Sequence, residues 1–167
     1  MGALFGRKQE LDRYVKQKYI TVSRITGGAT ANTLGQVAQK TVIEFLKNDL
    51  GEDYEIKSNA KVKLEGYEND EGIPFDIVVQ KNDNILGIEV SFQVTTNSTI
   101  ERKAAQAETR QNVMHKNGYK IAYIIDGAGN FARSSAITKI CQYSDCTIAY
   151  KQREFQLLGN FIRDVLI

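Results

Sequence analysis

The stretch PFDIVVQKNDNILGIEVSFQ, from Pro74 to Gln93, constrains the fold most strongly. Its two apolar segments flank the polar residues KNDN, a pattern that predicts two antiparallel strands joined by a turn. Each segment carries one carboxylate among its apolar residues, Asp76 in the first and Glu89 in the second. Because a buried carboxylate is costly unless another group pairs with it, we expect these two acids to have specific partners or a ligand.

The rest of the chain alternates between helix and strand signals. Apolar spacing and capping residues predict helices over residues 7–20, 32–50, 98–118, 132–144 and 153–167. Short alternating or apolar runs predict further strands at DYEIKS (53–58), AKVKLEG (60–66), KIAYIID (120–126) and CTIAY (146–150).

This order predicts an α/β fold in which helices flank a mixed central sheet. The strand that follows helix 98–118 is expected to join the hairpin in parallel, through a crossover. A length of 167 residues suits one domain. We divide it into an N-terminal helical extension (1–30), a core (31–150) and a closing helix (151–167).

The sequence predicts a cytoplasmic protein that does not enter a membrane. No apolar run approaches the ~20 residues that span a bilayer, and the first residues lack the apolar region of a signal peptide. The two cysteines, Cys141 and Cys146, make neither a disulfide framework nor a zinc motif with the lone His115.

Charge is unevenly distributed although the net charge is only +2. Residues 1–20 and 101–120 are basic, whereas residues 49–76 contain nine acids and three lysines. Basic segments beside an acidic one fit a nucleic-acid binder with a cation-binding centre. Solvated helix faces explain the same distribution without any ligand.

Two acids on neighbouring strands can be brought together near one edge of a sheet. Paired carboxylates bind hard divalent cations through oxygen, which suits Mg²⁺, with Mn²⁺ as a substitute. The alternatives are that one acid pairs with a nearby lysine, or that the strand register differs by one residue. Carboxylates more than about 7 Å apart on different surfaces would exclude a shared cation.

The motif P74-F-D76, twelve residues, then E89-V-S91 resembles the PD-(D/E)xK nuclease superfamily. The segments EVSFQVTTNSTIERKAAQAETR, IAYIIDGAGNFARSSAI and SDCTIAY are similar to the C-terminal parts of type II restriction endonucleases. The resemblance implies a restriction-endonuclease-like core over about residues 30–150 and Mg²⁺ held by Asp76 and Glu89. Glu44, on the core helix, matches a position that often adds a metal ligand in that family.

The chain departs from that motif because Ser91 stands where a lysine is expected, and serine cannot supply a cation to a nascent hydroxide. Lys103 on the next helix can point back to the site and replace the lysine. Gln93, on the same face of the strand as Glu89 and Ser91, is a second candidate. The third possibility is an inactive site on a scaffold.

Several further residues are candidates for contacts with DNA. Helix 98–118 presents basic and amide side chains at spacings of three and four, which can grip phosphates, and the loop GAGNFAR (127–133) can reach base edges. These candidates are Arg102, Gln106, Arg110, Asn130 and Arg133.

The function that the resemblance implies is an Mg²⁺-dependent endonuclease that hydrolyses phosphodiester bonds in double-stranded DNA. One site cuts one strand, so a double-strand break needs a homodimer, or a heterodimer with a larger subunit that recognises DNA. The alternatives are a structure-selective junction resolvase, a nuclease-like module that binds DNA or a partner without cutting, and an unrelated α/β domain with salt-bridged acids.

Overall fold

A computed structural model describes residues 28–65, 71–92, 99–127 and 133–167. The predicted helix over residues 7–20 and most of the N-terminal extension lie outside this part of the chain. In chain order, the elements are α2 (Gly28–Leu50), β1 (Glu55–Val62), β2 (Ile73–Lys81), β3 (Asn84–Phe92), α3 (Thr99–Lys116), β4 (Lys120–Asp126), α5 (Ser134–Gln142), β5 (Cys146–Ile148) and α6 (Gln152–Val165).

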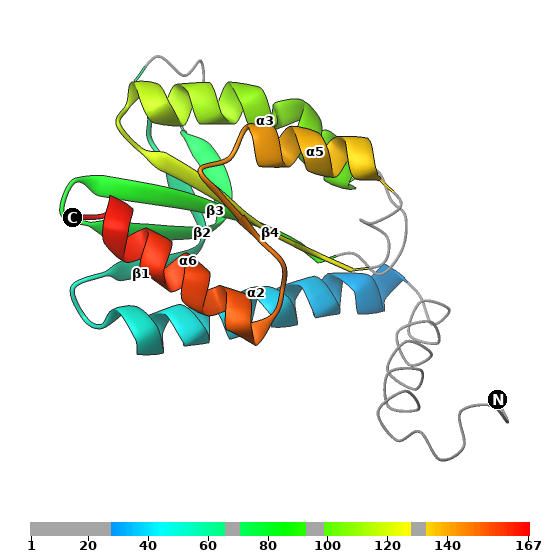
Figure 1. The fold of residues 1–167 in the computed structure, drawn as a ribbon, viewed down its shortest axis with the longest axis horizontal. Helices are drawn as coiled ribbons and strands as arrows, with labels where there is room; N and C mark the ends of the chain where they lie inside the picture. The colour runs from blue at the N-terminus through cyan, green and yellow to red at the C-terminus, as the bar shows by residue number, and fades with distance from the viewer. Residues whose placement is uncertain (1–27, 66–70, 93–98, 128–132) are drawn as a thin grey trace, which may run out of the picture.

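The predicted mixed α/β fold is confirmed. The five strands form one sheet in the order β1-β2-β3-β4-β5; β1, β2 and β3 are antiparallel, while β4 and β5 run parallel to β3. Helix α3 is the crossover between the parallel strands β3 and β4, as expected. Figure 1 shows α3 and α5 on one face of the sheet and α2 and α6 on the other.

Each face of the sheet has its own apolar core. The cluster under α2 and α6 includes Val42, Leu46, Ile88 and Ile162, and all four are fully buried. The cluster under α3 and α5 includes Phe75, Ala107, Ile121 and Ile140. A sheet covered on both faces explains why the central strands are almost continuously apolar, so that a polar side chain within them stands out.

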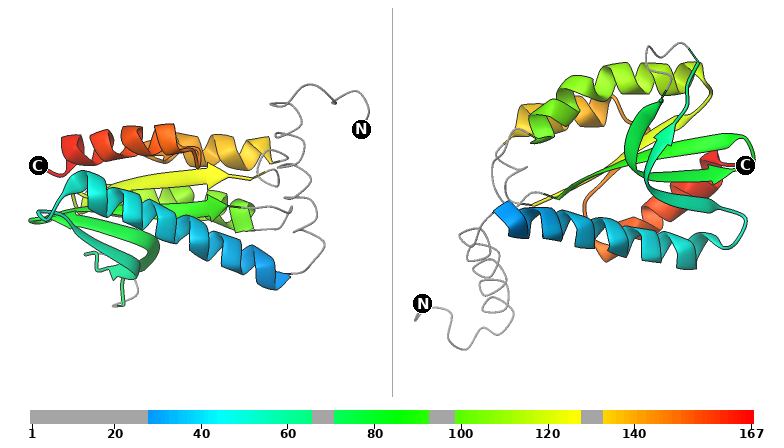
Figure 2. Two further views of the ribbon diagram at one scale, coloured as in Figure 1. Left: turned by 90° about the horizontal axis from the view of Figure 1, so that it is seen from below. Right: turned by 180° about the vertical axis from the view of Figure 1, so that it is seen from behind.

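Strands β2 and β3 are joined by a tight turn and pair with each other only over the part of the hairpin next to that turn. Asn82, in the two-residue turn, has a φ of 54°, a left-handed conformation that asparagine tolerates. The paired residues run from Lys81↔Asn84 to Ile77↔Ile88, where the register ends. Beyond this pair β2 stays with β1, and Figure 2 shows these two strands curling away from β3 and β4.

One predicted strand boundary is wrong. The segments 53–58 and 60–66 belong to one strand, β1, which pairs with β2 from Glu55↔Gln80 to Val62↔Ile73. Asn59 lies inside this strand with a φ of 48°. A single left-handed residue interrupts the alternation of the strand without ending it, so the sequence pattern looks like two strands.

No helix in the described part of the chain is long and apolar enough to cross a membrane.

Asp145, just before β5, ties together the ends of three elements. Its carboxylate accepts hydrogen bonds from the Ile121 N–H (2.9 Å) and the His115 ring (2.9 Å) and contacts the Lys120 ammonium at 3.3 Å. Burial raises the pKa of Asp145, but these hydrogen bonds and charges outweigh burial and hold the pKa below its usual value. The ionised carboxylate therefore stabilises the fold.

We predict that Asp145→Asn lowers the free energy of unfolding at pH 7 by about 1–3 kcal/mol, because charge-assisted hydrogen bonds are lost. A lowered folded-state pKa gives stability that is fully present above the unfolded value of about 3.9 and is lost as pH falls through the folded value. The difference between wild type and variant should therefore shrink below about pH 4. Urea unfolding at several pH values measures it.

The exposed Asp53 provides the control, since Asp53→Asn removes the same charge without these contacts. Equal stabilities of Asp145→Asn and wild type at pH 7 would contradict the role of Asp145.

Candidate active site

The two carboxylates singled out in the sequence lie where β2 and β3 separate. Ile77 and Ile88 are the last residues that pair between β2 and β3; Asp76 directly precedes Ile77 in the chain, and Glu89 directly follows Ile88. Because the strands diverge at this point, the space between them is filled by side chains rather than by backbone hydrogen bonds. The Asp76 side chain is 31% exposed, whereas that of Glu89 is only 5% exposed.

Asp76 replaces part of the missing backbone ladder. Its Oδ2 accepts a hydrogen bond of 2.7 Å from the N–H of Val90 on β3. Its backbone carbonyl accepts one from the side chain of Gln39 on α2, and the same Gln39 amide donates to Asn59 Oδ1 at 3.3 Å. These contacts hold the end of β2 at a fixed distance from β3 and from α2.

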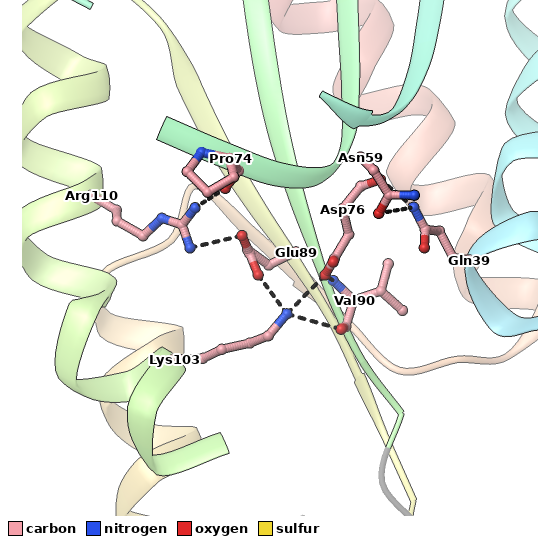
Figure 3. A network of polar contacts seen from close by, with 8 residues as sticks. All are labelled: Gln39, Asn59, Pro74, Asp76, Glu89, Val90, Lys103 and Arg110. Atoms are coloured by element: carbon pink, nitrogen blue, oxygen red, sulfur yellow. Dashed lines mark hydrogen bonds and ion pairs between the residues drawn. The ribbon is translucent and has the colours of Figure 1, made fainter. Parts of the chain in front are cut away.

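Lys103, on α3, places its ammonium between the two acids (Figure 3). The Nζ atom lies 2.8 Å from Asp76 Oδ2, 2.5 Å from Glu89 Oε2 and 3.0 Å from the carbonyl oxygen of Val90. The residue is 9% exposed. Because the two carboxylates share one ammonium, they face the same space. Their arrangement is therefore compatible with a cation held by both.

Arg110 reaches the same site from two turns further along α3. It lies seven residues after Lys103, which places both side chains on one face of the helix. Its Nη1 lies 2.8 Å from Glu89 Oε1, its Nη2 donates to the carbonyl of Pro74, and the guanidinium stacks 4.6 Å from the centre of the Phe75 ring. Glu89 is therefore held by one cation at each oxygen.

Gly87 is what allows the Phe75 ring to lie under Arg110. A Cβ atom at position 87 would come within 2.6 Å of that ring, so any larger residue would displace it. The sequence signal is a glycine inside an apolar strand, which often marks a close approach of another group.

Tyr123 on β4 lies beside Glu89 in the sheet register. Burial raises the pKa of its hydroxyl, the charge of Glu89 raises it further, and Arg110 opposes this increase. The hydroxyl is therefore protonated, and it has no hydrogen-bond partner among the described residues. Tyr123 therefore places a neutral hydroxyl near Glu89.

A pocket of about 510 Å³ opens beside the two carboxylates. The pocket brings together most of the site residues predicted on the hairpin and on helix 98–118. Those that line it are Asp76, Glu89, Arg102, Lys103, Gln106 and Arg110. Arg102 and Gln106 are exposed at its rim, whereas the Arg110 side chain is 13% exposed and points inward. The DNA contact predicted for Arg110 stays a prediction, and the structure adds an internal partner.

The expectation that Glu44 joins the acids is not met. Its side chain is 63% exposed on α2 and lies 3.8 Å from the Lys40 ammonium, and no cluster of three His, Cys, Asp or Glu side chains suited to a metal occurs in the described ranges. The face of α2 that reaches the site carries Gln39 instead, five residues earlier. A helical pattern finds the helix but does not identify which polar residue of α2 meets the sheet.

The remaining candidates lie apart from the pocket or outside the described residues. Ser91 is 3% exposed on β3 and does not line the pocket. Arg133 pairs with Glu101 on α3. Gln93 and Asn130 fall in segments that the structure does not describe.

Gln39, Asn59 and Tyr123 contribute to the site but were not among the predicted residues. Asn59 carried a usable signal, since it breaks the alternation of its strand. Gln39 and Tyr123 carried none, because a helical glutamine and an apolar-flanked tyrosine are common everywhere.

The oxygens around Lys103 Nζ fit a hard divalent cation. Asp76 Oδ2, Glu89 Oε2 and the Val90 carbonyl oxygen all lie within 3.0 Å of one positive charge. Mg²⁺ prefers oxygen ligands and is often held by only one or two carboxylates with several waters completing its shell. A site with two carboxylates and a carbonyl, open to a pocket, meets that description.

Comparison with known proteins finds similarity to half of two curated type II restriction enzymes. The type II restriction enzyme HgiCI of Herpetosiphon aurantiacus is 51% identical over 166 residues, which is 98% of this chain and 48% of that protein. The type II restriction enzyme BanI of Aneurinibacillus aneurinilyticus is 52% identical over 170 residues, 99% of this chain and 48% of that protein. The chain thus spans about half the length of these curated relatives.

Among solved structures, the small subunit of the heterodimeric restriction endonuclease R.BspD6I aligns with a TM-score of 0.47 and 14% sequence identity. The alignment covers 89% of this chain and 77% of that chain. The family described as the BanI C-terminal domain matches residues 8–166. With nearly its whole length inside that match, the chain belongs to the BanI C-terminal domain family.

Proposed function

We propose that this chain is the strand-cleaving part of a type II restriction endonuclease and hydrolyses phosphodiester bonds of double-stranded DNA with Mg²⁺. The observation that carries the proposal is the convergence of Asp76, Glu89 and the Val90 carbonyl on one positive charge, beside a pocket that is also lined by arginines. Family membership and the two restriction enzymes that share half their length with this chain support it.

Asp76 and Glu89 would hold the cation, with the Val90 carbonyl as a third oxygen. A divalent cation held there would polarise a phosphoryl oxygen and make a nearby water more acidic. Arg110 keeps Glu89 in place through Oε1, which leaves Oε2 directed to the cation. The Val90 N–H holds Asp76 through Oδ2, the same oxygen that would face the cation.

Lys103 would supply the positive charge that the family motif places two residues after Glu89, where this chain has Ser91. Its ammonium reaches the acids from α3 instead of from β3. There it can stabilise the charge on the attacking water and on the phosphate in the transition state. Arg102 and Gln106, at the rim of the pocket, would position the DNA backbone.

DNA recognition would require more protein than this chain. A core that carries the cleavage site uses most of its 167 residues, and the curated relatives are about twice as long. One site cuts one strand, so the active form would be a dimer, either of two copies or with a larger recognition subunit. Two-fold symmetry would then match a palindromic target.

A binding module that holds DNA without cutting it is the second candidate. It is favoured by the observation that both carboxylates already have cationic partners within the protein. The two functions differ in whether a divalent cation produces cleavage.

We predict that the protein nicks or linearises supercoiled plasmid with Mg²⁺ or Mn²⁺ but not with EDTA, and that Asp76→Asn lowers the rate at least about 100-fold because a metal ligand is lost. Asp83→Asn, in the exposed turn of the same hairpin, is the matched control and should cut like wild type. Gel electrophoresis of timed samples measures both rates.

Full activity of Asp76→Asn would exclude the proposed site. Binding to DNA without cleavage under every metal condition would establish the binding module instead.

A variant at Arg110 distinguishes a role in positioning Glu89 from a direct contact with DNA. If Arg110 acts by holding Glu89, Arg110→Gln should lower single-turnover cleavage at saturating DNA by about 10-fold or more, while the Kd for DNA changes less than about twofold. If the guanidinium instead contacts a phosphate, the Kd should weaken and cleavage at saturation should persist. Arg153→Gln, at an exposed arginine on α6, is the matched control.

Arg102 is predicted to contact a phosphate, because it is exposed at the rim of the pocket. Arg102→Gln should weaken DNA binding and reduce the slope of log K against log salt concentration by about 1. Fluorescence anisotropy between 50 and 200 mM salt, about the range over which such contacts matter, measures the slope. An unchanged slope would place Arg102 away from the DNA backbone.

A further inference from the structure

Lys103 occupies the point at which the metal-binding oxygens meet. Its ammonium lies 2.8 Å from Asp76 Oδ2, 2.5 Å from Glu89 Oε2 and 3.0 Å from the Val90 carbonyl. These are the three oxygens assigned above to the cation. A divalent ion in contact with the same atoms would overlap the ammonium, and the two positive charges would repel each other strongly at such a distance.

We propose that the Lys103 ammonium and a divalent cation are alternative occupants of one oxygen site, so that cation binding displaces the ammonium toward the pocket. This inference rests on the proposed function of the site. In the absence of a divalent cation, Lys103 would neutralise the two carboxylates. The affinity of the site for the cation would then depend partly on the free energy needed to displace the Lys103 ammonium.

The two carboxylates do not depend on Lys103 alone for their positions. Glu89 Oε1 is held at 2.8 Å by Arg110, which also binds the Pro74 carbonyl and stacks on Phe75. Asp76 Oδ2 is held at 2.7 Å by the Val90 N–H. Because these contacts come from other directions, the oxygens stay together when the ammonium leaves, and the site is ready for another cation.

The pocket beside the carboxylates offers space for the displaced ammonium. Lys103 itself lines the pocket of about 510 Å³, together with Thr99 and Gln106 of the same helix. A lysine carries its charge on a flexible four-carbon stem, so a change of side-chain rotamer moves the charge without moving α3. In the pocket the ammonium would lie on the side of Arg102 and Gln106, which are proposed to position the DNA backbone.

The test uses Mg²⁺ alone and needs no DNA. The wild-type protein, labelled with ¹⁵N at lysine, is titrated with Mg²⁺ while the Lys103 ammonium signal is followed, and the signal is assigned by its loss in Lys103→Arg. We expect a signal protected from exchange with water, which moves to the position and exchange rate of exposed lysines. The half-point should match that of the binding heat in calorimetry.

Calorimetry on variants gives a second readout. Because the cation no longer has to displace a charge, Lys103→Met should bind Mg²⁺ at least about tenfold more tightly than wild type. Lys116→Met removes a lysine from the exposed end of the same helix and should change the affinity less than about twofold. Asp76→Asn should remove the binding heat. Circular dichroism checks that each variant is folded. If Lys103→Met is unfolded, the NMR titration of the wild-type protein alone tests whether Mg²⁺ displaces the ammonium.

A Lys103 signal that stays protected at saturating Mg²⁺ would show that ammonium and cation sit side by side, which overturns the exchange but leaves the metal site intact. Absence of binding heat in wild type and in Lys103→Met would overturn both the exchange and the proposed metal site. Heat that persists in Asp76→Asn would place the cation elsewhere and also overturn the exchange.

Discussion

The cluster of two acids and two bases between β2, β3 and α3 is the interaction on which the site depends. Asp76 and Glu89 come from the sheet, and Lys103 and Arg110 come from one face of the helix. Removing one partner from a buried ion pair typically costs about 3–5 kcal/mol, because the other charge is left uncompensated. The cluster therefore links α3 to the two strands of the hairpin at the point where they separate.

The cluster exists because β2 and β3 stop pairing. The last paired residues are Ile77 and Ile88, and the backbone groups released there are taken up by side chains: the Val90 N–H by Asp76, and the Asp76 carbonyl by Gln39. A regular ladder would have left no room for carboxylates between the strands. The same opening produces the pocket, so the departure from regular structure and the candidate chemistry have one physical cause.

The sequence predicted those parts of the structure that follow from a repeating pattern. The apolar hairpin, the crossover helix and the two interrupting acids were all visible, and Lys103 on that helix was one of the residues expected to replace the lysine missing at Ser91. Glu44 and Gln39 show the limit of such patterns. Both lie on one amphipathic helix, and which of them meets the sheet depends on the rotation of that helix, which is set by packing rather than by local sequence.

Asn59 shows a second limit. Its left-handed backbone keeps β1 continuous where the alternation of side chains is broken, and alternation is all that the sequence displays. The resemblance to the PD-(D/E)xK motif predicted a lysine at position 91 of β3, where the chain has Ser91. The ammonium instead comes from Lys103 on α3, which tertiary packing brings to the acids.

The most direct test of the central claim is a crystal structure of the protein with Mn²⁺, with anomalous scattering used to locate the ion. We expect a peak between Asp76 and Glu89, with the ion in contact with their oxygens and with the Val90 carbonyl at about the 2.0–2.1 Å that suits Mg²⁺. Mn²⁺ at another position, or no anomalous peak beside Asp76 and Glu89 at saturating Mn²⁺, would contradict the proposed site.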